Sequence, residues 1–450
     1  MEIDRSLKPP VTSEISYKGP DFESFTLENN LDVYFIKKDT LPIISANIVI
    51  NGGSVFEQTD KKGISNLLAM CIDEGAGRYN SLELSEQFDL LGAQFSIFTN
   101  SDTIQISLQS LKENFAKALK LLSMILTEPH FKQKDFEREK RNILTKLKQL
   151  NDDPDYLAST LFKYHLFGEM SPYSFPVIGL NKDIARVTNK EVMSFYNKYI
   201  MPGNSFMIVV GDVSKAILKR YLNKTFSSWS SDHSNIKFDS TEKSDEKVVY
   251  IVDKKDSVQT EIRTGHHTTG RNSKDYFAKH LLNTILGGQF TSRINLNLRE
   301  KHGYTYGAGS NFNYYKNNAY FAVSTSVGIE NTANALNEIF KELEKSRDGV
   351  TDEELEFAKS SIIRKFPLNF ETYGQVASNF IGKVIFNLPK DYFDTYIDNI
   401  NSVSIDDVNK AAIENIFPDL TTTLLVGDKT KIIDQLENHD FGDVVVVDKI

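Results

Sequence analysis

Hydrophobic and polar positions alternate in some segments of the chain and recur with a helical period in others. Alternation at Leu31 to Ile36 and at Ile44 to Ile50 predicts two strands, and Asn51 to Gly53 predicts the turn that ends the second one. The alternating run from Tyr320 to Thr325 predicts a hairpin strand packed on a second core. Helical spacing predicts helices at 64–73, 81–91, 111–126, 134–150 and 189–199. Strands and helices mixed without regular βαβ alternation favour an α+β fold with largely antiparallel sheets.

A repeat within the chain predicts two similar halves. It consists of three pairs of similar segments: 199–202 and 416–418, 209–212 and 425–428, and 134–137 and 351–354. The first two pairs are 216 residues apart and the third is at nearly the same offset. Solenoid periods are several times shorter, so a repeat of this size indicates a duplicated domain. We therefore expect an α+β protein with two similar halves, each a mainly antiparallel sheet packed with helices.

A polar stretch divides the chain almost equally. Ser227 to Lys247 is rich in Ser, Asp and Lys and short of large apolar residues, which is typical of a linker. We predict a first domain at residues 1–228, a linker at 229–247 and a second domain at 248–450. A chain of 450 residues also exceeds what one hydrophobic core usually serves.

Composition and charge narrow the classes of function. The net charge of -9, with basic residues interleaved among acids, argues against a nucleic-acid partner, because phosphate binding depends on clustered Lys and Arg. Cys71 is the only cysteine, which excludes an intramolecular disulfide and a Cys-based zinc site. No apolar run is long enough to span a bilayer, and residues 1–20 carry charges and prolines where a signal peptide needs an apolar stretch. A cytoplasmic location is expected, or a periplasmic one if a signal peptide has been trimmed from the sequence.

Several short segments, taken in order, resemble the pitrilysin or insulinase-like family of zinc peptidases, which includes the mitochondrial processing peptidase. These segments are Phe25 to Leu31, Gly63 to Leu68, Phe136 to Lys140, Asp152 to Pro154, and Pro172-Tyr173 with Pro176 to Gly179. The similarity runs from roughly Phe25 to Asp428. It implies the two-half metallohydrolase fold of that family.

The zinc motif of that family is degenerate in this chain. Active members carry H-x-x-E-H on a helix, with the two His as ligands, the Glu as general base and a distant Glu completing the site. The resemblance places these roles on Asn66, Ala69, Met70 and Lys146. Asn and Met are feeble zinc ligands, and an ammonium at a ligand position repels a dication. We therefore predict neither a metal site nor a catalytic residue in this chain.

The remaining histidines offer no substitute site. His266 and His267 are adjacent on a strand, where neighbouring side chains point to opposite faces, and the others are scattered without ligand spacing.

Arg299 and Tyr306 resemble the Arg/Tyr motif of the family's non-zinc half. The resemblance implies that both reach substrate held at the zinc, since Arg offers a fork for a peptide carbonyl or carboxylate and a Tyr hydroxyl can donate to an oxyanion. The alternative interpretation is an Arg299 ion pair with Glu300 or Glu354 and a tyrosine packed at the start of a strand.

The resemblance implies a catalytically silent subunit of a heteromeric zinc metallopeptidase. Such a subunit binds unfolded peptide together with a zinc-bearing homologous subunit, so zinc is expected in the partner and no cofactor in this chain. Two alternatives stay open. One is a non-proteolytic scaffold or peptide-binding protein of the same fold, and the other is an autonomous metallopeptidase with an unrecognised metal site.

Overall fold

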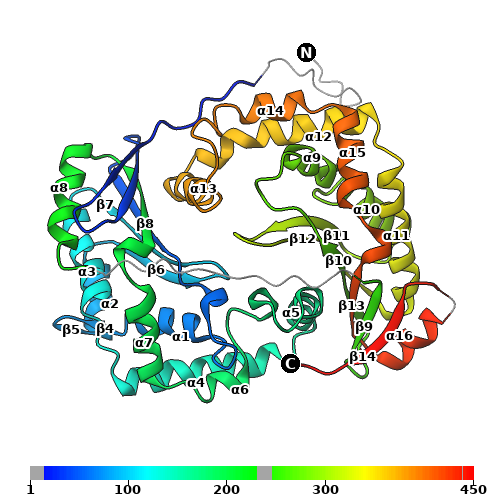
Figure 1. The fold of residues 1–450 in the computed structure, drawn as a ribbon, viewed down its shortest axis with the longest axis horizontal. Coiled ribbons are helices and arrows are strands. Elements are labelled where there is room, and N and C mark those ends of the chain that lie inside the picture. Colours follow the sequence, from blue (N-terminus) through cyan, green and yellow to red (C-terminus); the bar gives the residue numbers. More distant parts are fainter. Residues whose placement is uncertain (1–14, 231–245, 438) are drawn as a thin grey trace, which may run out of the picture.

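The computed structural model describes residues 15–230, 246–437 and 439–450. Two six-stranded sheets, one from each part of the chain, lie on opposite sides of the molecule with helices around them (Figure 1). The predicted α+β fold with two similar halves is confirmed. Most of the predicted linker falls outside the described residues, and the domain boundaries at 228 and 248 stay a prediction.

The first sheet is antiparallel except where β2 meets β8. Its strands, in spatial order, are β1 (Glu23–Thr26), β2 (Asp32–Lys37), β8 (Ser205–Gly211), β3 (Ile43–Ile50), β7 (Ile104–Leu111) and β6 (Gln94–Thr99). A small hairpin of β4 (Gly75–Ala76) and β5 (Tyr79–Asn80) lies apart from this sheet. The helices of this part are α1 (Ile64–Cys71), α2 (Ser81–Leu90), α3 (Phe115–Thr127), α4 (Gln133–Leu150), α5 (Pro154–Phe167), α6 (Asn181–Ile184), α7 (Asn189–Tyr199) and α8 (Lys215–Phe226).

The second sheet repeats this order from the other end. Its strands are β11 (Ala308–Tyr314), β12 (Ala319–Gly328), β10 (Gln259–His267), β13 (Thr422–Gly427), β9 (Val248–Asp253) and β14 (Asp443–Val447). The β13–β9 and β9–β14 pairs are parallel. The helices of this part are α9 (Tyr276–Leu286), α10 (Arg293–Asn295), α11 (Thr332–Arg347), α12 (Asp352–Lys365), α13 (Tyr373–Ile385), α14 (Tyr396–Ser402), α15 (Ile405–Asn415) and α16 (Lys429–Leu436).

The sequence repeat coincides with equivalent strands. Val209 to Gly211 lie in β8, between β2 and β3, and Leu425 to Gly427 lie in β13, between β9 and β10. The outermost strands differ, because β1 pairs antiparallel with β2 whereas β14 pairs parallel with β9. The duplication therefore covers five strands of each sheet and leaves the sixth to local sequence.

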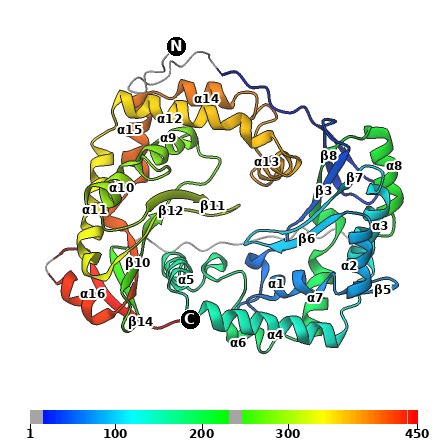
Figure 2. The same ribbon diagram turned by 180° about the vertical axis from the view of Figure 1, so that it is seen from behind.

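Each half gives one helix to the sheet of the other half. Helix α5 packs on β10 and β13, and its Phe162 shares a buried cluster with Leu424 and Val426. Helix α13 packs on β3 and β8, and its Phe380 shares a buried cluster with Val210. Both views of the ribbon show α5 beside the second sheet and α13 beside the first (Figures 1 and 2). The two halves are therefore joined by a reciprocal exchange of helices.

A hairpin tip adds a polar contact between the halves. The backbone N–H of Lys316, between β11 and β12, donates to the Asp102 carboxylate at 3.0 Å, and Tyr173 donates to the same carboxylate at 2.7 Å. The Tyr315 ring stacks on Tyr173 with 4.6 Å between centroids. Burial raises the pKa of Asp102 above its usual range.

One predicted boundary is wrong. The helix expected from residue 111 begins at Phe115, because Leu111 is the last residue of β7 and residues 112–114 form the turn. An apolar residue at the end of a strand fits the helical period of the following segment equally well, so periodicity alone does not separate them.

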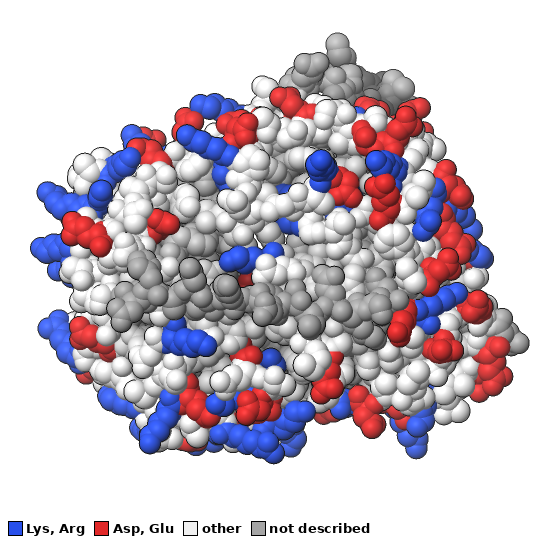
Figure 3. Space-filling view, viewed as in Figure 1, with Lys and Arg blue, Asp and Glu red and all other residues white. Residues whose placement is uncertain are grey.

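None of the helices that the structure describes combines the length and the apolar character needed to cross a bilayer. Charged side chains of both signs are interspersed around the face seen in Figure 3. This surface contrasts with the clustered basic charge of nucleic-acid-binding faces.

Candidate functional site

Helix α1 starts from a buried turn. Gly63 has a φ of +96° and precedes the helix, and a Cβ at this position would lie 2.6 Å from the Ile178 carbonyl oxygen. The buried Glu57 carboxylate accepts hydrogen bonds from the backbone N–H groups of Gly63 (2.8 Å) and Ser65 (2.9 Å). Burial raises the pKa of Glu57 to about 7, although these hydrogen bonds favour its charged form. The turn therefore fixes the helix that carries the degenerate zinc motif.

The positions of the zinc motif come together on one side of α1. The Asn66 side-chain nitrogen lies 4.0 Å from the Met70 sulfur, within hydrogen-bonding range for a thioether acceptor. Ala69, at the position of the general base, is buried and carries no functional group. The three positions thus share one side of α1, and none of them carries an imidazole or a carboxylate.

Helix α4, which packs against α1, carries the remaining position. Lys146 is exposed on α4, whereas Glu139, two turns earlier, is buried and pairs with Arg138 at 2.9 Å. Burial raises the pKa of Asp73 to about 6, and the nearby Glu74 and Glu139 carboxylates add to this rise. Acidic groups therefore gather at the C-terminal end of α1, within one turn of Met70.

These residues do not fit zinc. An amide, a methyl group, a thioether and an ammonium stand where the family places two imidazoles and two carboxylates. Within residues 15–230, 246–437 and 439–450, no group of three or more His, Cys, Asp or Glu side chains is arranged to hold a metal ion. No step of catalysis can be assigned to this helix face.

Arg299 lies in an irregular helical segment, Leu296–Lys301, that precedes β11. Its guanidinium stacks over the ring of Phe290, which is 63% exposed, at 4.4 Å from the centroid. It also pairs with Glu300 at 3.2 Å. Glu354 pairs instead with Arg293 at 2.6 Å, so the predicted ion pair occurs with Glu300 and not with Glu354.

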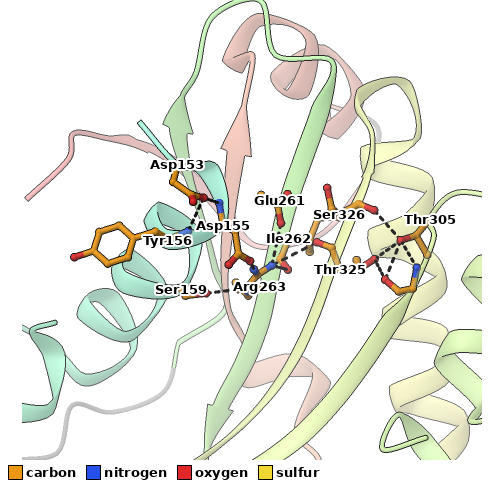
Figure 4. Close-up of polar contacts among 11 residues, drawn as sticks. Asp153, Asp155, Tyr156, Ser159, Glu261, Ile262, Arg263, Thr305, Thr325 and Ser326 are labelled. Carbon is orange, nitrogen blue, oxygen red and sulfur yellow. Dashed lines mark hydrogen bonds and ion pairs between the residues drawn. The ribbon is translucent and has the colours of Figure 1, made fainter. Parts of the chain in front are cut away.

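Tyr306 projects into solvent from the loop that enters β11. The residue is 96% exposed, so it does not pack at the start of the strand as the alternative interpretation expected. The preceding residue, Thr305, holds the loop in place. Its hydroxyl lies 2.8 Å from the Ser326 carbonyl oxygen, and it accepts hydrogen bonds from the Thr325 hydroxyl (3.0 Å) and from the Gly307 backbone N–H (3.1 Å) (Figure 4). The loop is therefore held in place while the Tyr306 ring is exposed to solvent.

A polar network connects this loop to the first half. Arg263 of β10 donates to the carbonyl oxygens of Ile262 (2.9 Å) and Thr325 (3.5 Å), and it pairs with Asp155 of α5 (Figure 4). Thr325 in turn contacts Thr305. The sequence did not indicate these roles for Asp155 and Arg263, because nothing in its pattern places α5 on the second sheet.

Comparisons with known proteins agree with this geometry. Residues 33–170 match the family described as insulinase (peptidase family M16), and residues 186–362 match the peptidase M16 inactive domain. The chain belongs to the M16 peptidase family. The two matches together take in strands of both sheets, with β1, β13 and β14 outside the matched ranges.

Relatives in the M16 family have names of two kinds. A "non-peptidase homolog YmxG" of Helicobacter pylori is 26% identical over 386 residues, which cover 84% of this chain and 87% of that protein. An "uncharacterized zinc protease" of Rickettsia felis is 24% identical over 421 residues, which cover 90% of this chain and 98% of that protein. With Asn66, Ala69 and Met70 in the zinc positions, these similarities support a catalytically inactive M16-like protein.

Solved structures establish the fold. A peptidase M16 inactive domain from Pseudomonas fluorescens superimposes with a TM-score of 0.85 at 22% identity, covering 91% of this chain and 98% of that one. A protease from Helicobacter pylori gives a TM-score of 0.84 at 22% identity, covering 90% and 99%.

Proposed function

We propose that this M16 chain is a catalytically silent subunit that pairs with a zinc-bearing homologous subunit, and that the two enclose an unfolded peptide. The observation that supports this best is the placement of Tyr306. Its ring is 96% exposed on a loop that Thr305 holds in place. A tyrosine that is positioned by its loop but makes no core contact is suited to contact a group from outside the chain.

Arg299 and Tyr306 would hold the peptide and stabilise charge that develops on it, and neither side chain would act as a nucleophile, a base or a metal ligand. The guanidinium, stacked on Phe290, can donate two parallel hydrogen bonds to a peptide carbonyl or carboxylate, and the phenol can donate one to an oxygen that gains negative charge. Catalytic residues and zinc would belong to the partner, because the zinc-motif positions here carry no suitable donors. The division of labour matches a chain whose zinc half is degenerate and whose Arg/Tyr half is intact.

The test is purification of this chain from its native cell under mild salt, with mass spectrometry of bound proteins and metal analysis of the complex. A stoichiometric homologue carrying H-x-x-E-H, with about one zinc per pair, supports the proposal. Recovery of this chain alone, or with unrelated proteins and without zinc, contradicts it and favours the non-proteolytic scaffold. Chelator-sensitive peptidase activity in the isolated, partner-free chain also contradicts it and favours the autonomous metallopeptidase.

A further inference from the structure

A cavity of about 560 Å³ opens on the first half, and none of its lining residues belongs to the second sheet or to the loop of Tyr306. The β4–β5 hairpin, α2, α3 and the end of α8 surround it. Its volume falls within the range of small-molecule sites, about 300 to 1,000 Å³. The cavity therefore has the size for a ligand and is separate from the site proposed above.

Four cationic side chains stand around this cavity. They are Arg78, Lys117, Lys120 and Lys224, and among the described residues of the lining Glu128 is the only acidic one. The chain as a whole has a net charge of -9, so this excess of positive charge is local. Several Lys and Arg side chains also project along the left edge of the space-filling view, on the side where α3 and α8 lie (Figure 3).

None of these four cations has an acidic partner among the described residues. The Arg78 guanidinium instead donates to the Tyr79 hydroxyl at 2.5 Å and stacks over the same ring at 4.8 Å from its centroid. Other lysines of this half do form ion pairs, as Lys112 does with Asp212 (2.7 Å) and Lys215 does with Glu23 (2.7 Å). Like charges that outnumber the nearby carboxylates and form no ion pair repel one another and favour the binding of an anion.

The floor of the cavity is largely apolar, with Ser123 as its buried polar member. Leu121 is 6% exposed, and Met124 and Leu91 are partly buried beside it. Lys117 and Lys120 stand one turn apart on the exposed side of α3, the helix that also supplies Leu121 and Met124. A cationic rim over an apolar floor suits a ligand that has anionic groups at one end and a ring or chain at the other.

We propose that this cavity binds a small organic phosphate. The phosphate groups would lie between Arg78 and the three lysines, because Arg and Lys are the side chains that most often donate hydrogen bonds to phosphate in proteins. The organic portion would lie on Leu121 and Met124, where contact removes apolar surface from water. This inference does not depend on the proposed function.

The test is isothermal titration of the full chain with ADP, pyrophosphate and adenosine as probes. ADP is expected to bind more tightly than pyrophosphate, and adenosine is expected not to bind. The double variant Lys117→Glu with Lys120→Glu should weaken ADP binding by about tenfold or more, because it replaces two attractive charges by two repulsive ones. The matched control is Lys182→Glu with Lys190→Glu, which makes the same charge change on exposed lysines of α6 and α7 outside the lining.

A second variant distinguishes ADP binding inside the cavity from general electrostatic attraction to the surface. Gln87→Trp keeps every charge of the lining but fills part of the cavity, and it should also weaken ADP binding. Equal affinity for pyrophosphate and ADP would overturn the role of the apolar floor. Absence of ADP binding at millimolar concentration, or an equal loss in the control variant, would overturn the site itself.

Discussion

Arg263 on β10 forms an ion pair with Asp155 on α5, so a buried cation of the second sheet takes its carboxylate from a helix of the first half. The Arg263 side chain is 9% exposed whereas that of Asp155 is 73% exposed. The same guanidinium also lies 3.4 Å from Glu261 on its own strand. The pair therefore anchors α5 to the sheet of the other half through one polar contact. This contact lies next to β12, the strand that forms hydrogen bonds with Thr305.

Loss of this pair is expected to destabilise the protein modestly. Asp155→Ala removes the exposed partner and leaves the Arg263 charge with Glu261 and the backbone carbonyls. Because Asp155 is largely solvated, the free energy of unfolding should fall by about 1 kcal/mol, well below the cost of breaking a fully buried pair. Urea unfolding measures this change. The matched control, Asp60→Ala at an exposed position, should leave the midpoint unchanged, and equal midpoints for both variants would contradict the prediction.

Truncation of the buried Phe380 side chain on the exchanged helix α13 is expected to destabilise both halves together. Phe380 is 1% exposed and contacts the rings of Phe22 (5.3 Å) and Phe393 (5.2 Å). Phe380→Ala should lower the free energy of unfolding by about 3 to 5 kcal/mol through lost burial and a residual cavity. Thermal unfolding followed by calorimetry should still show one transition at a lower temperature. Two separate transitions in the wild-type chain would show that the helix exchange does not couple the halves.

The stability of α1 is expected to depend on pH through Glu57. Its folded pKa of about 7 lies above the ordinary value of 4.5, so between these values the folded state keeps a proton that the unfolded state releases. The contribution of Glu57 to the free energy of unfolding is therefore largest below about pH 4.5. It falls by up to about 3 kcal/mol as the pH rises towards about 7. Glu57→Gln resembles the protonated form and should remove this part of the pH dependence.

Urea midpoints at pH 5 and pH 8 test this prediction. The Glu57→Gln variant should lose less stability than the wild type between the two pH values. Glu86→Gln, at an exposed carboxylate of α2, serves as the control and should keep the wild-type slope. A Glu57→Gln variant with an unchanged slope would show that the buried carboxylate does not titrate in this window.

Zinc binding is expected to return when the donor atoms return. The variant Asn66→His, Ala69→Glu, Met70→His and Lys146→Glu restores the family's motif on two helices that still pack together. It should retain about one zinc per chain after gel filtration, as measured by plasma mass spectrometry, whereas the wild type should retain none. The same variant with Lys146 kept should bind more weakly, because the ammonium repels the cation. Failure of the full variant to bind zinc, although folded, would show that α1 and α4 have diverged in geometry as well.

Substitution of Arg299 or Tyr306 is expected to lower turnover. Tyr306→Phe and Arg299→Ala should lower the kcat/KM of the assembled peptidase by about tenfold or more, because each removes a donor to the bound peptide. Unfolding midpoints should be unchanged for Tyr306→Phe, whose ring is 96% exposed. Tyr221→Phe, on α8, serves as the control. Full activity of both variants within an active complex would contradict the role proposed for the pair.

Local patterns predicted the elements well and their packing poorly. Helix α7 has the predicted bounds, 189–199, and β3 begins within one residue of its prediction, since period and flanking turns are local properties. The exchange of α5 and α13 was not predictable in this way. An apolar stripe shows that a helix is buried, but it does not show which of two similar sheets covers it.

The candidate site, too, was predictable from the sequence only in part. The loss of donor atoms at Asn66, Ala69 and Met70 was evident from residue identity once the resemblance was recognised. The exposure of Tyr306 was not, because it depends on Thr305, Thr325 and Ser326, which come together only when β12 lies beside the loop. Tertiary contacts between distant segments decide such positions, and no single-segment pattern carries them.

The reciprocal packing of α5 and α13 has a consequence for the origin of the chain. A single half, produced alone, would carry a helix without a sheet to cover and a sheet without its covering helix. In two copies of such a half, the helix of each copy could cover the sheet of the other, which is the geometry of a domain-swapped homodimer. The present protein has the form of that dimer joined into one polypeptide.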